Sequence, residues 1–216
     1  MTATSGPPGP VDLLRQLLRF DTSNPPGEVT ECVSHLQSLL EDAGLETRRF
    51  AARPDRPCLW ARLRGEGAAP PLLFYGHADV VPAEPDRWTH PPFGGDVVDG
   101  DVWGRGALDM KGGLAMMTAA LLRAARDDAP AGDLVLLVLP DEESTSEHGA
   151  RYLVREHPEL FRDIRYAVGE LGGFPLHFGG ETYYTIQVAA KRLCWLEAEV
   201  HGETGGHGSL PVPGSA

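Results

Sequence analysis

Two short apolar runs constrain the fold of this chain most strongly. They cover residues 71–76 (Pro-Leu-Leu-Phe-Tyr-Gly) and residues 133–140 (Asp-Leu-Val-Leu-Leu-Val-Leu-Pro), and neither alternates with polar residues. Such runs are typical of strands that are buried on both faces of a helix-covered sheet. Apolar residues recur at helical spacing in three other segments, 11–18, 33–40 and 114–126. Helices that alternate with buried strands predict an α/β domain.

Shorter strands are expected between these segments. Residues 46–50, 59–63 and 165–168 are predicted as strands. Residues 97–103 are predicted as a hairpin, because they contain an Asp-Gly pair that suits a tight turn. Residues 193–198 also have a strand-like pattern, and composition changes near residue 186. We therefore expect a second domain to begin there.

Composition excludes several classes of protein. The 216-residue chain is 42% hydrophobic and 23% charged, which is typical of a folded globular protein. Its formal net charge of −12, without a Lys/Arg cluster, disfavours nucleic acid and anionic membranes as partners. No segment reaches about 18 uninterrupted apolar residues, so no membrane-spanning helix is expected. Residues 1–10 have neither the basic nor the apolar region of an export signal and are expected to form a disordered tail.

The cysteines indicate a reducing compartment. Cys32, Cys58 and Cys194 are odd in number, lie far apart and form no C-x-x-C pair. This usage argues against a disulfide framework and against a cysteine zinc site. We expect a cytoplasmic protein.

Metal-binding side chains follow the predicted strands. In α/β domains, ligands bind at the carboxyl ends of the strands. His77 and Asp79 follow the first apolar run, residues 141–143 (Asp-Glu-Glu) follow the second, and Glu170 follows the strand over 165–168. Asp109 lies in a glycine-rich turn ahead of a helix. One imidazole and several carboxylates suit borderline divalent ions such as Zn²⁺, Co²⁺ or Mn²⁺.

The spacing of these residues indicates different roles. In a two-metal site one carboxylate can bridge both ions, and an unligated carboxylate can accept a proton from water. His77 and Asp79 point to the same side of an extended chain, so Asp79 can hold the imidazole in its correct tautomer. Glu142 and Glu143 are adjacent and point in different directions. One would be a ligand and the other the general base.

Each motif also has a simpler interpretation. The His-x-Asp pair alone would be an ordinary surface pair, and residues 141–143 alone would be a solvated loop or a helix start. Asp109 could simply begin a helix, and His207 could lie in an exposed glycine-rich loop. Their joint occurrence after buried strands favours a metal site. Signature motifs of dinucleotide, nucleotide, thermolysin-like zinc and serine-hydrolase sites are absent from the sequence.

Five segments together resemble a known family. They are Gly76–Pro82 (GHADVVP), Trp88–Phe93 (WTHPPF), Gly104–Gly112 (GRGALDMKG), Asp141–Glu143 (DEE) and Gly206–Pro211 (GHGSLP). In order and spacing they are similar to the di-zinc metallopeptidase family of acetylornithine deacetylase, succinyl-diaminopimelate desuccinylase, glutamate carboxypeptidase and aminoacylase.

The resemblance implies a role for each candidate residue. His77 and Glu170 would bind one zinc ion, Asp109 would bridge both ions, and Glu143 would bind the other. Glu142 resembles the general base.

Further residues take supporting roles in this resemblance. Asp79 resembles the partner that orients His77. The Asp109–Met110 peptide bond would be cis. His207 resembles a lid histidine that, in homodimeric members, reaches into the neighbouring subunit's site and stabilises an oxyanion.

The resemblance also implies a fold and a domain order. The fold would be a three-layer helix-sheet-helix catalytic domain with a mostly parallel twisted sheet over residues 11–186. Residues 187–216 would be the truncated start of an α+β lid and dimerisation domain. Family members are about twice as long and return to the catalytic domain to supply a last histidine ligand. Four of five expected ligands would therefore be present.

The implied activity is hydrolysis of an amide bond in a small peptide or N-acyl amino acid through a metal-bound hydroxide. The alternative is a catalytically weak or silent remnant that acts at most as a metal-binding or interaction module. A third hypothesis is that a separate chain supplies the missing half.

Overall fold

The computed structural model describes residues 6–170, 175–186, 188–189 and 196–199. The chain divides into two units, Met1–Leu171 and Gly172–Ala216.

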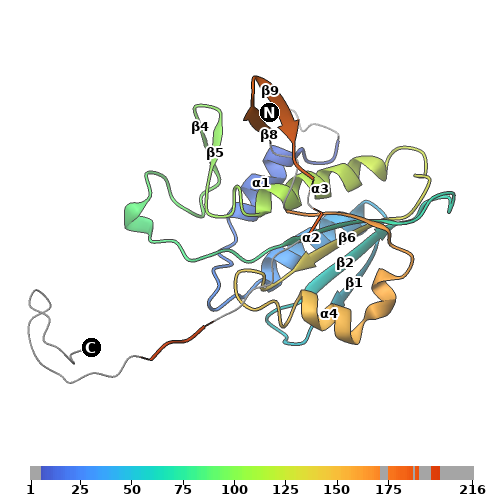
Figure 1. Cartoon of the computed structure of the whole chain (residues 1–216), viewed down its shortest axis with the longest axis horizontal. Coiled ribbons are helices and arrows are strands. Elements are labelled where there is room, and N and C mark those ends of the chain that lie inside the picture. The colour runs from blue at the N-terminus through green and yellow to red at the C-terminus, as the bar shows by residue number, and fades with distance from the viewer. Residues whose placement is uncertain (1–5, 171–174, 187, 190–195, 200–216) are drawn as a thin grey trace, which may run out of the picture. The chain divides into compact units, whose positions relative to one another are not determined.

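The first unit is built on a five-stranded sheet of order β1-β2-β6-β3-β7, of which Figure 1 labels β1, β2 and β6. The strands are β1 (Glu46–Phe50), β2 (Cys58–Leu63), β3 (Leu72–His77), β6 (Leu134–Leu139) and β7 (Tyr166–Val168). β3 is parallel to β6 and β7, whereas β2 is antiparallel to β1 and β6. Four of the five strands therefore run in one direction, which confirms the predicted mostly parallel sheet.

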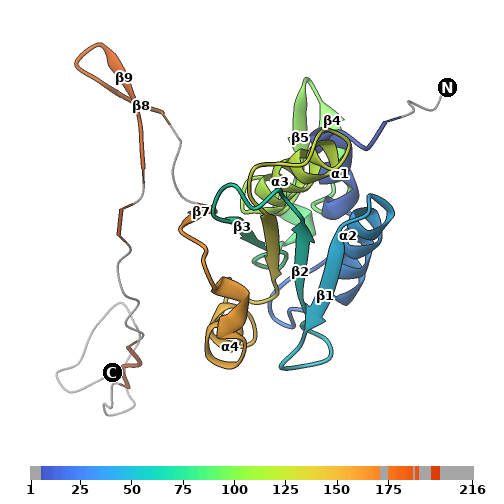
Figure 2. The ribbon, with the colours of Figure 1, turned by 90° about the vertical axis from the view of Figure 1, so that its right-hand side faces the viewer.

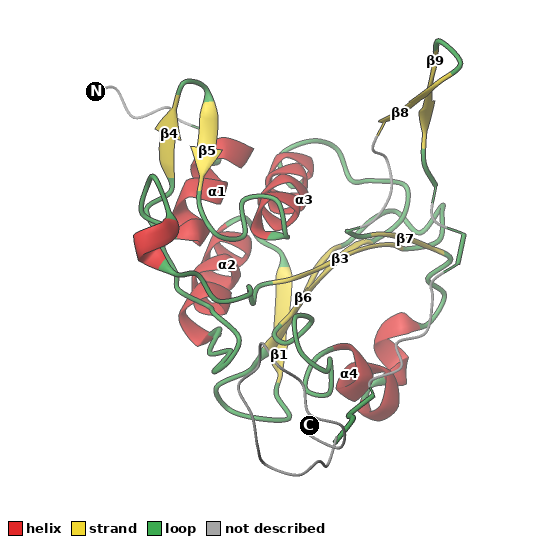
Figure 3. Cartoon of the chain, turned by 60° about the vertical axis from the view of Figure 1, so that its left-hand side comes forward, coloured by secondary structure: helices red, strands yellow, loops and turns green. Residues whose placement is uncertain are grey.

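Helices cover both faces of this sheet (Figures 2 and 3). Helices α1 (Pro10–Leu18), α2 (Thr30–Asp42) and α3 (Lys111–Ala124) pack on one face, where their leucines meet Leu59, Leu136 and Val138 of the sheet. Helix α4 (Ala150–Glu156) packs on the other face, where Leu153 lies in a second cluster with Trp60, Leu73, Val135 and Leu137. The predicted three-layer α/β architecture is confirmed for this unit.

The two apolar runs lie at the centre of the sheet. β6 is buried at every residue but its first, as its continuous apolar sequence predicts. The parallel register pairs Leu72 with Leu134 and His77 with Leu139. The carboxyl ends of β3 and β6 therefore lie side by side, and the residues that follow them share one edge of the sheet.

Smaller elements complete the described chain. The predicted hairpin forms from β4 (Asp96–Val98) and β5 (Asp101–Trp103), and short 3₁₀ helices cover Pro85–Arg87 and Pro158–Phe161. In the second unit, β8 (Pro175–Phe178) and β9 (Glu181–Tyr184) form an antiparallel hairpin that the sequence analysis did not predict. The strand expected over 193–198 lies partly outside the described residues, and residues 196–198 are irregular. Within the described segments, no helix has the length and apolar character needed to cross a membrane.

Candidate metal centre

His77, the last residue of β3, forms the centre of the candidate site. Its side chain is only 1% exposed. The ring Nδ1 lies 2.8 Å from the backbone carbonyl oxygen of Asp79 and 3.3 Å from its carboxylate. Because a carbonyl only accepts, Nδ1 donates, so loss of a proton from the ring would leave the lone pair on Nε2.

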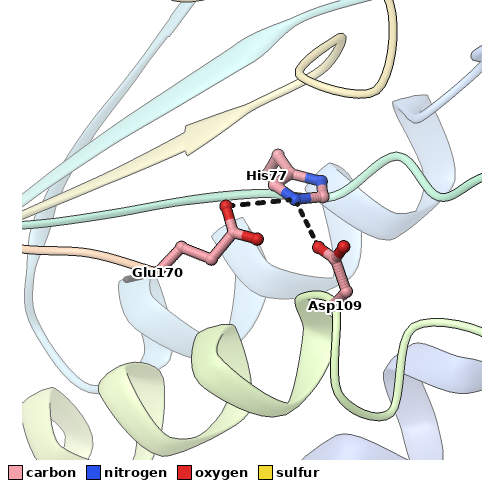
Figure 4. A group of neighbouring side chains, drawn as sticks. All are labelled: His77, Asp109 and Glu170. Carbon is pink, nitrogen blue, oxygen red and sulfur yellow. Dashed lines mark hydrogen bonds and ion pairs between the residues drawn. The ribbon is translucent and has the colours of Figure 1, made fainter. Parts of the chain in front are cut away.

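The Nε2 atom faces three carboxylates. It lies 3.0 Å from Oδ1 of Asp109, 3.8 Å from Oε2 of Glu170 and 3.8 Å from Oε2 of Glu142. His77, Asp109 and Glu170 each offer one ligand atom, and these atoms lie within 4.8 Å of one another (Figure 4). Residues from three separate segments thus converge at one edge of the sheet.

Two glycines allow this convergence. A Cβ atom on Gly169 would lie 2.2 Å from Cζ of Tyr75, so only glycine lets the chain after β7 approach β3 closely enough to deliver Glu170. A Cβ atom on Gly76 would lie 2.7 Å from Cε of Met110. The absence of a side chain at Gly76 therefore seats Met110, and with it Asp109, against β3.

Asp79 ties the site to the loop after β6. Its carboxylate is fully buried and accepts hydrogen bonds from the backbone N–H groups of Glu142 and Glu143, each at 3.1 Å. The same carboxylate accepts a 2.8 Å hydrogen bond from Nδ2 of Asn24. Asp79 thus orients both the imidazole and the adjacent glutamates.

The two glutamates take different positions, as their adjacency predicts. Glu142 lies near His77 with half of its side chain exposed. Glu143 is not part of the cluster of His77, Asp109 and Glu170, and it lines a cavity of about 440 Å³ together with Asp109. Trp88 and Trp103 are among the other residues of that cavity wall.

The charges of the cluster perturb one another. Burial opposes protonation of His77, but the hydrogen bond and charge of Asp79 outweigh burial and raise its pKa to about 9. Desolvation and then the charge of Asp109 raise the pKa of Glu170 to about 7. Desolvation, followed by the charge of Asp109, also raises the pKa of Glu143. One imidazole therefore faces more negative charge than it can balance, and a divalent cation would balance it.

The donor set fits such a cation. An imidazole nitrogen with a fixed tautomer and carboxylate oxygens are ligand types that Zn²⁺, Co²⁺ and Mn²⁺ all accept. The structure places His77, Asp109, Glu170 and Glu142 together, with Asp79 behind the imidazole and Glu143 beside Asp109. The Asp109–Met110 peptide bond is cis, as the resemblance implied. His207 lies outside the described residues.

Two residues near the site could not be predicted from the sequence. Asn24, the only asparagine of the chain, lies in the run Ser23–Gly27, whose two prolines and glycine are typical of an ordinary loop. Lys111 follows Asp109 closely and is fully buried, with its ammonium bonded to the carbonyl oxygens of Leu17 and Phe20. The long-range contacts that make these two residues important leave no periodic signal in the sequence.

The sequence is similar to those of curated proteins. A succinyl-diaminopimelate desuccinylase of Rhodospirillum centenum (strain ATCC 51521 / SW) is 40% identical over 152 residues, which cover 67% of this chain and 38% of the relative. The chain thus spans about two fifths of the length of that relative.

Solved structures share the fold. The M20 family metallo-carboxypeptidase Sso-CP2 from Sulfolobus solfataricus superposes with a TM-score of 0.64 at 24% identity, over 73% of this chain and 36% of that one. Human carnosine dipeptidase 1 superposes with a TM-score of 0.63 at 22% identity, over 74% of this chain and 37% of that one. A family model for peptidase family M20/M25/M40 matches residues 73–206, well over half of the chain. The chain belongs to this M20/M25/M40 peptidase family.

Proposed function

We propose that this chain forms the metal-binding part of an enzyme that hydrolyses an amide bond in a small peptide or an N-acyl amino acid. One observation carries the proposal: Nε2 of a buried histidine and the carboxylates of Asp109 and Glu170 converge within 4.8 Å at the carboxyl edge of the sheet. Membership of a peptidase family, and a relative named as a desuccinylase, support the reaction class.

The residues divide the work between metal binding and proton transfer. His77 and Glu170 would hold one ion, Asp109 would bridge two, and Glu143 would bind the second. When bound, zinc would act as a Lewis acid and lower the pKa of water. The Glu142 carboxylate, 3.8 Å from Nε2 of His77 and half exposed, would take a proton from the attacking water at Oε2. It would then deliver that proton to the leaving nitrogen.

Other parts of the proposal extend beyond the described site. We assign residues 11–186 to the catalytic domain and residues 187–216 to the start of a lid, with His207 stabilising the oxyanion in a homodimer. We propose two zinc ions per site, with cobalt or manganese as the alternatives that the same donor set would accept. A cytoplasmic location stays a prediction from cysteine usage.

Replacement of Glu142 by alanine tests the proposed proton transfer. The variant should bind zinc like the wild type but lose amide hydrolysis, because Glu142 moves a proton and binds no metal. Zinc content by atomic emission and hydrolysis of N-succinyl and N-acetyl amino acids are the two measurements. Retained turnover in this variant would refute the role of Glu142. His77→Ala is the control, and this variant should no longer bind zinc.

The same assays decide between the proposal and the silent remnant. A purified 216-residue chain that hydrolyses N-acyl amino acids eliminates the remnant. A chain that binds zinc and hydrolyses none of them, alone or with any co-purifying chain, supports a metal-binding module instead.

A further inference from the structure

We infer that Asn24 is a positioning residue of the metal centre that acts on His77 through Asp79. The inference rests on the proposed metal-binding function and adds to it a loop that lies far from the metal-binding segments in sequence. Asn24 lies between α1 and α2, in the run Ser23–Gly27.

The carboxamide of Asn24 is buried among the groups that support the site. The residue is 6% exposed. Its Nδ2 atom lies 2.8 Å from Oδ2 of Asp79 and 3.1 Å from Oγ of Ser144. Because an ionised carboxylate only accepts hydrogen bonds, the amide nitrogen must be the atom that faces Asp79. Besides His77, Asn24 is the only side chain in the described part of the chain that makes a hydrogen bond or ion pair with the Asp79 carboxylate.

The backbone around Asn24 is fixed to the segment that carries Asp79. Asn24 N–H donates to the carbonyl oxygen of Val80 at 2.8 Å, and Val80 N–H donates to that of Thr22 at 3.1 Å. The Thr22 hydroxyl donates to the carbonyl oxygen of Ala78 at 2.6 Å. Residues 22–24 and 78–80 therefore form a short parallel pairing, which holds the carboxamide at a set distance from Asp79.

Gly27 closes the loop over the carboxamide. Its φ of 74° lies in the left-handed region that favours glycine. A Cβ atom on Gly27 would lie 2.9 Å from both Cγ and Oδ1 of Asn24. The loop thus leaves the carboxamide little room to rotate, which is the property a positioning residue requires.

The consequence falls on Asp79. Its Oδ2 atom accepts from Asn24 at 2.8 Å and from the Glu143 N–H at 3.1 Å, while Oδ1 accepts from the Glu142 N–H at 3.1 Å. Without Asn24, Oδ2 loses its shortest hydrogen bond, and only two backbone N–H groups then hold the carboxylate beside Nδ1 of His77. Partners of metal-binding histidines are commonly worth a factor of about 10–100 in metal affinity.

Replacement of Asn24 by leucine, which has the same shape but no donor, tests the inference. Zinc affinity, measured by competition with a chromophoric chelator, should fall about tenfold. Ser144→Ala should leave the affinity nearly unchanged, because it keeps the Asn24–Asp79 hydrogen bond. Leu40→Ala, at a fully buried position of α2, should lower thermal stability and leave zinc affinity unchanged. Equal zinc affinities for the wild type and Asn24→Leu would overturn the inference. A loss of zinc affinity in Ser144→Ala as large as that in Asn24→Leu would also overturn it.

A second measurement applies even if Asn24→Leu fails to fold. Because Asn24 is the only asparagine, [¹⁵N]asparagine labelling gives one side-chain NH₂ pair in an NMR spectrum of the whole chain. The chemical shifts of this NH₂ pair should change when zinc is added, and the midpoint of the change should equal the midpoint of zinc binding. The pair should also shift in Asp79→Asn without zinc. If the NH₂ signals shift neither on zinc addition nor in Asp79→Asn, the inference is overturned. If the wild-type chain binds no zinc at all, the proposed function fails, whereas the Asp79→Asn spectrum still reports the Asn24–Asp79 contact.

Discussion

At the scale of single residues, Asp109 combines an exposed side chain with a fixed position. Its carboxylate is 60% exposed, yet the next two residues are buried, at 3% for Met110 and 0% for Lys111. Met110 fills the space beside Gly76, and the Lys111 ammonium donates to the carbonyl oxygens of Leu17 and Phe20 at 3.1 and 2.7 Å. These carbonyls lie at the C-terminal end of α1, where the helix dipole favours a cation. Burial lowers the pKa of Lys111.

Replacement of Lys111 by methionine should therefore destabilise the protein by about 3 kcal/mol, because two buried carbonyl oxygens lose charge-assisted hydrogen bonds. Lys111→Gln keeps two N–H donors and should recover part of this loss. Urea unfolding at neutral pH measures both free energies. A methionine variant as stable as the wild type would contradict the anchoring role of the ammonium.

A second prediction at this scale concerns Gly169. Alanine at this position brings a Cβ atom within 2.2 Å of Cζ of Tyr75, so the chain that leads to Glu170 must shift. Zinc affinity should fall about tenfold, as expected for displacement of one ligand. The double variant Gly169→Ala/Tyr75→Leu removes the ring and should recover affinity. Isothermal titration calorimetry gives both constants, and an unchanged affinity in the single variant would refute the steric argument.

The residues of the site differ in how far the sequence could predict them. His77, Glu142 and Glu170 each lie within two residues of the end of a predicted strand, so the order of the chain is enough to place them at strand ends. Asn24 meets Asp79 across 55 residues of sequence and comes from a loop without periodicity. Lys111 could not be predicted as buried, because lysine is almost always exposed unless specific acceptors surround it.

At the scale of elements, a charged network joins β1 to β2. Glu46 of β1 lies 2.6 Å from Arg62 of β2, its register partner, and 2.7 Å from Arg48. Hydrogen bonds from Arg62 and Arg48 lower the pKa of Glu46 to about 2. Because the folded-state pKa lies below the unfolded value, this stabilisation is present above about pH 4.5 and is lost as the pH falls toward 2.

Glu46→Gln should therefore lower stability by about 1 kcal/mol at pH 7, since the pair is partly exposed and screened by solvent. The difference from wild type should shrink as the pH falls below 4. Chemical unfolding of both proteins at pH 7, 4 and 3 measures it. A difference that is constant across this range would show that the ion pairs contribute nothing through ionisation. Glu66→Gln is the matched control, because the Glu66 side chain makes no ion pair within the described residues.

The buried strands were easier to predict from the sequence than the start of helix α3 or the exposed β8–β9 hairpin. The runs that became β3 and β6 are apolar throughout, and burial on both faces explains their composition. Helix α3 begins at Lys111, three residues before the start of the helical pattern predicted for 114–126. The pattern could not show this start, because the glycines at 112 and 113 carry no hydrophobic signal. The β8–β9 hairpin turns at Gly179 and Gly180, both with positive φ, and each of its strands is only four residues long. Four residues are the lower limit for an alternating pattern, so hydrophobic patterning gives only a weak signal for these strands.

At the scale of the whole molecule, repulsion among negative charges disfavours the folded state when no cation is bound. Both the site and the chain as a whole are acidic. The chain has a net charge of −12, and the edge of its sheet gathers Asp109, Glu142, Glu143 and Glu170 around one imidazole. A cation that binds only the folded state removes this repulsion and stabilises by mass action. The stabilisation is about 2.7 kcal/mol when free ligand is 100 times the dissociation constant.

Zinc should therefore raise the melting temperature of the chain by about 5–10 °C at such a concentration, as expected for a domain of this size. The rise should continue with the logarithm of zinc concentration, and a chelator should reverse it. His77→Ala should abolish the response, whereas Lys111→Gln, which keeps every carboxylate and the imidazole, should retain it at a lower starting temperature. Differential scanning calorimetry with zinc and with magnesium measures the effect. Magnesium is the control because it prefers oxygen ligands and keeps its waters, so its shift should be much smaller. A melting temperature that does not respond to zinc in the wild type would mean that the folded cluster of His77, Asp109 and Glu170 does not bind the ion.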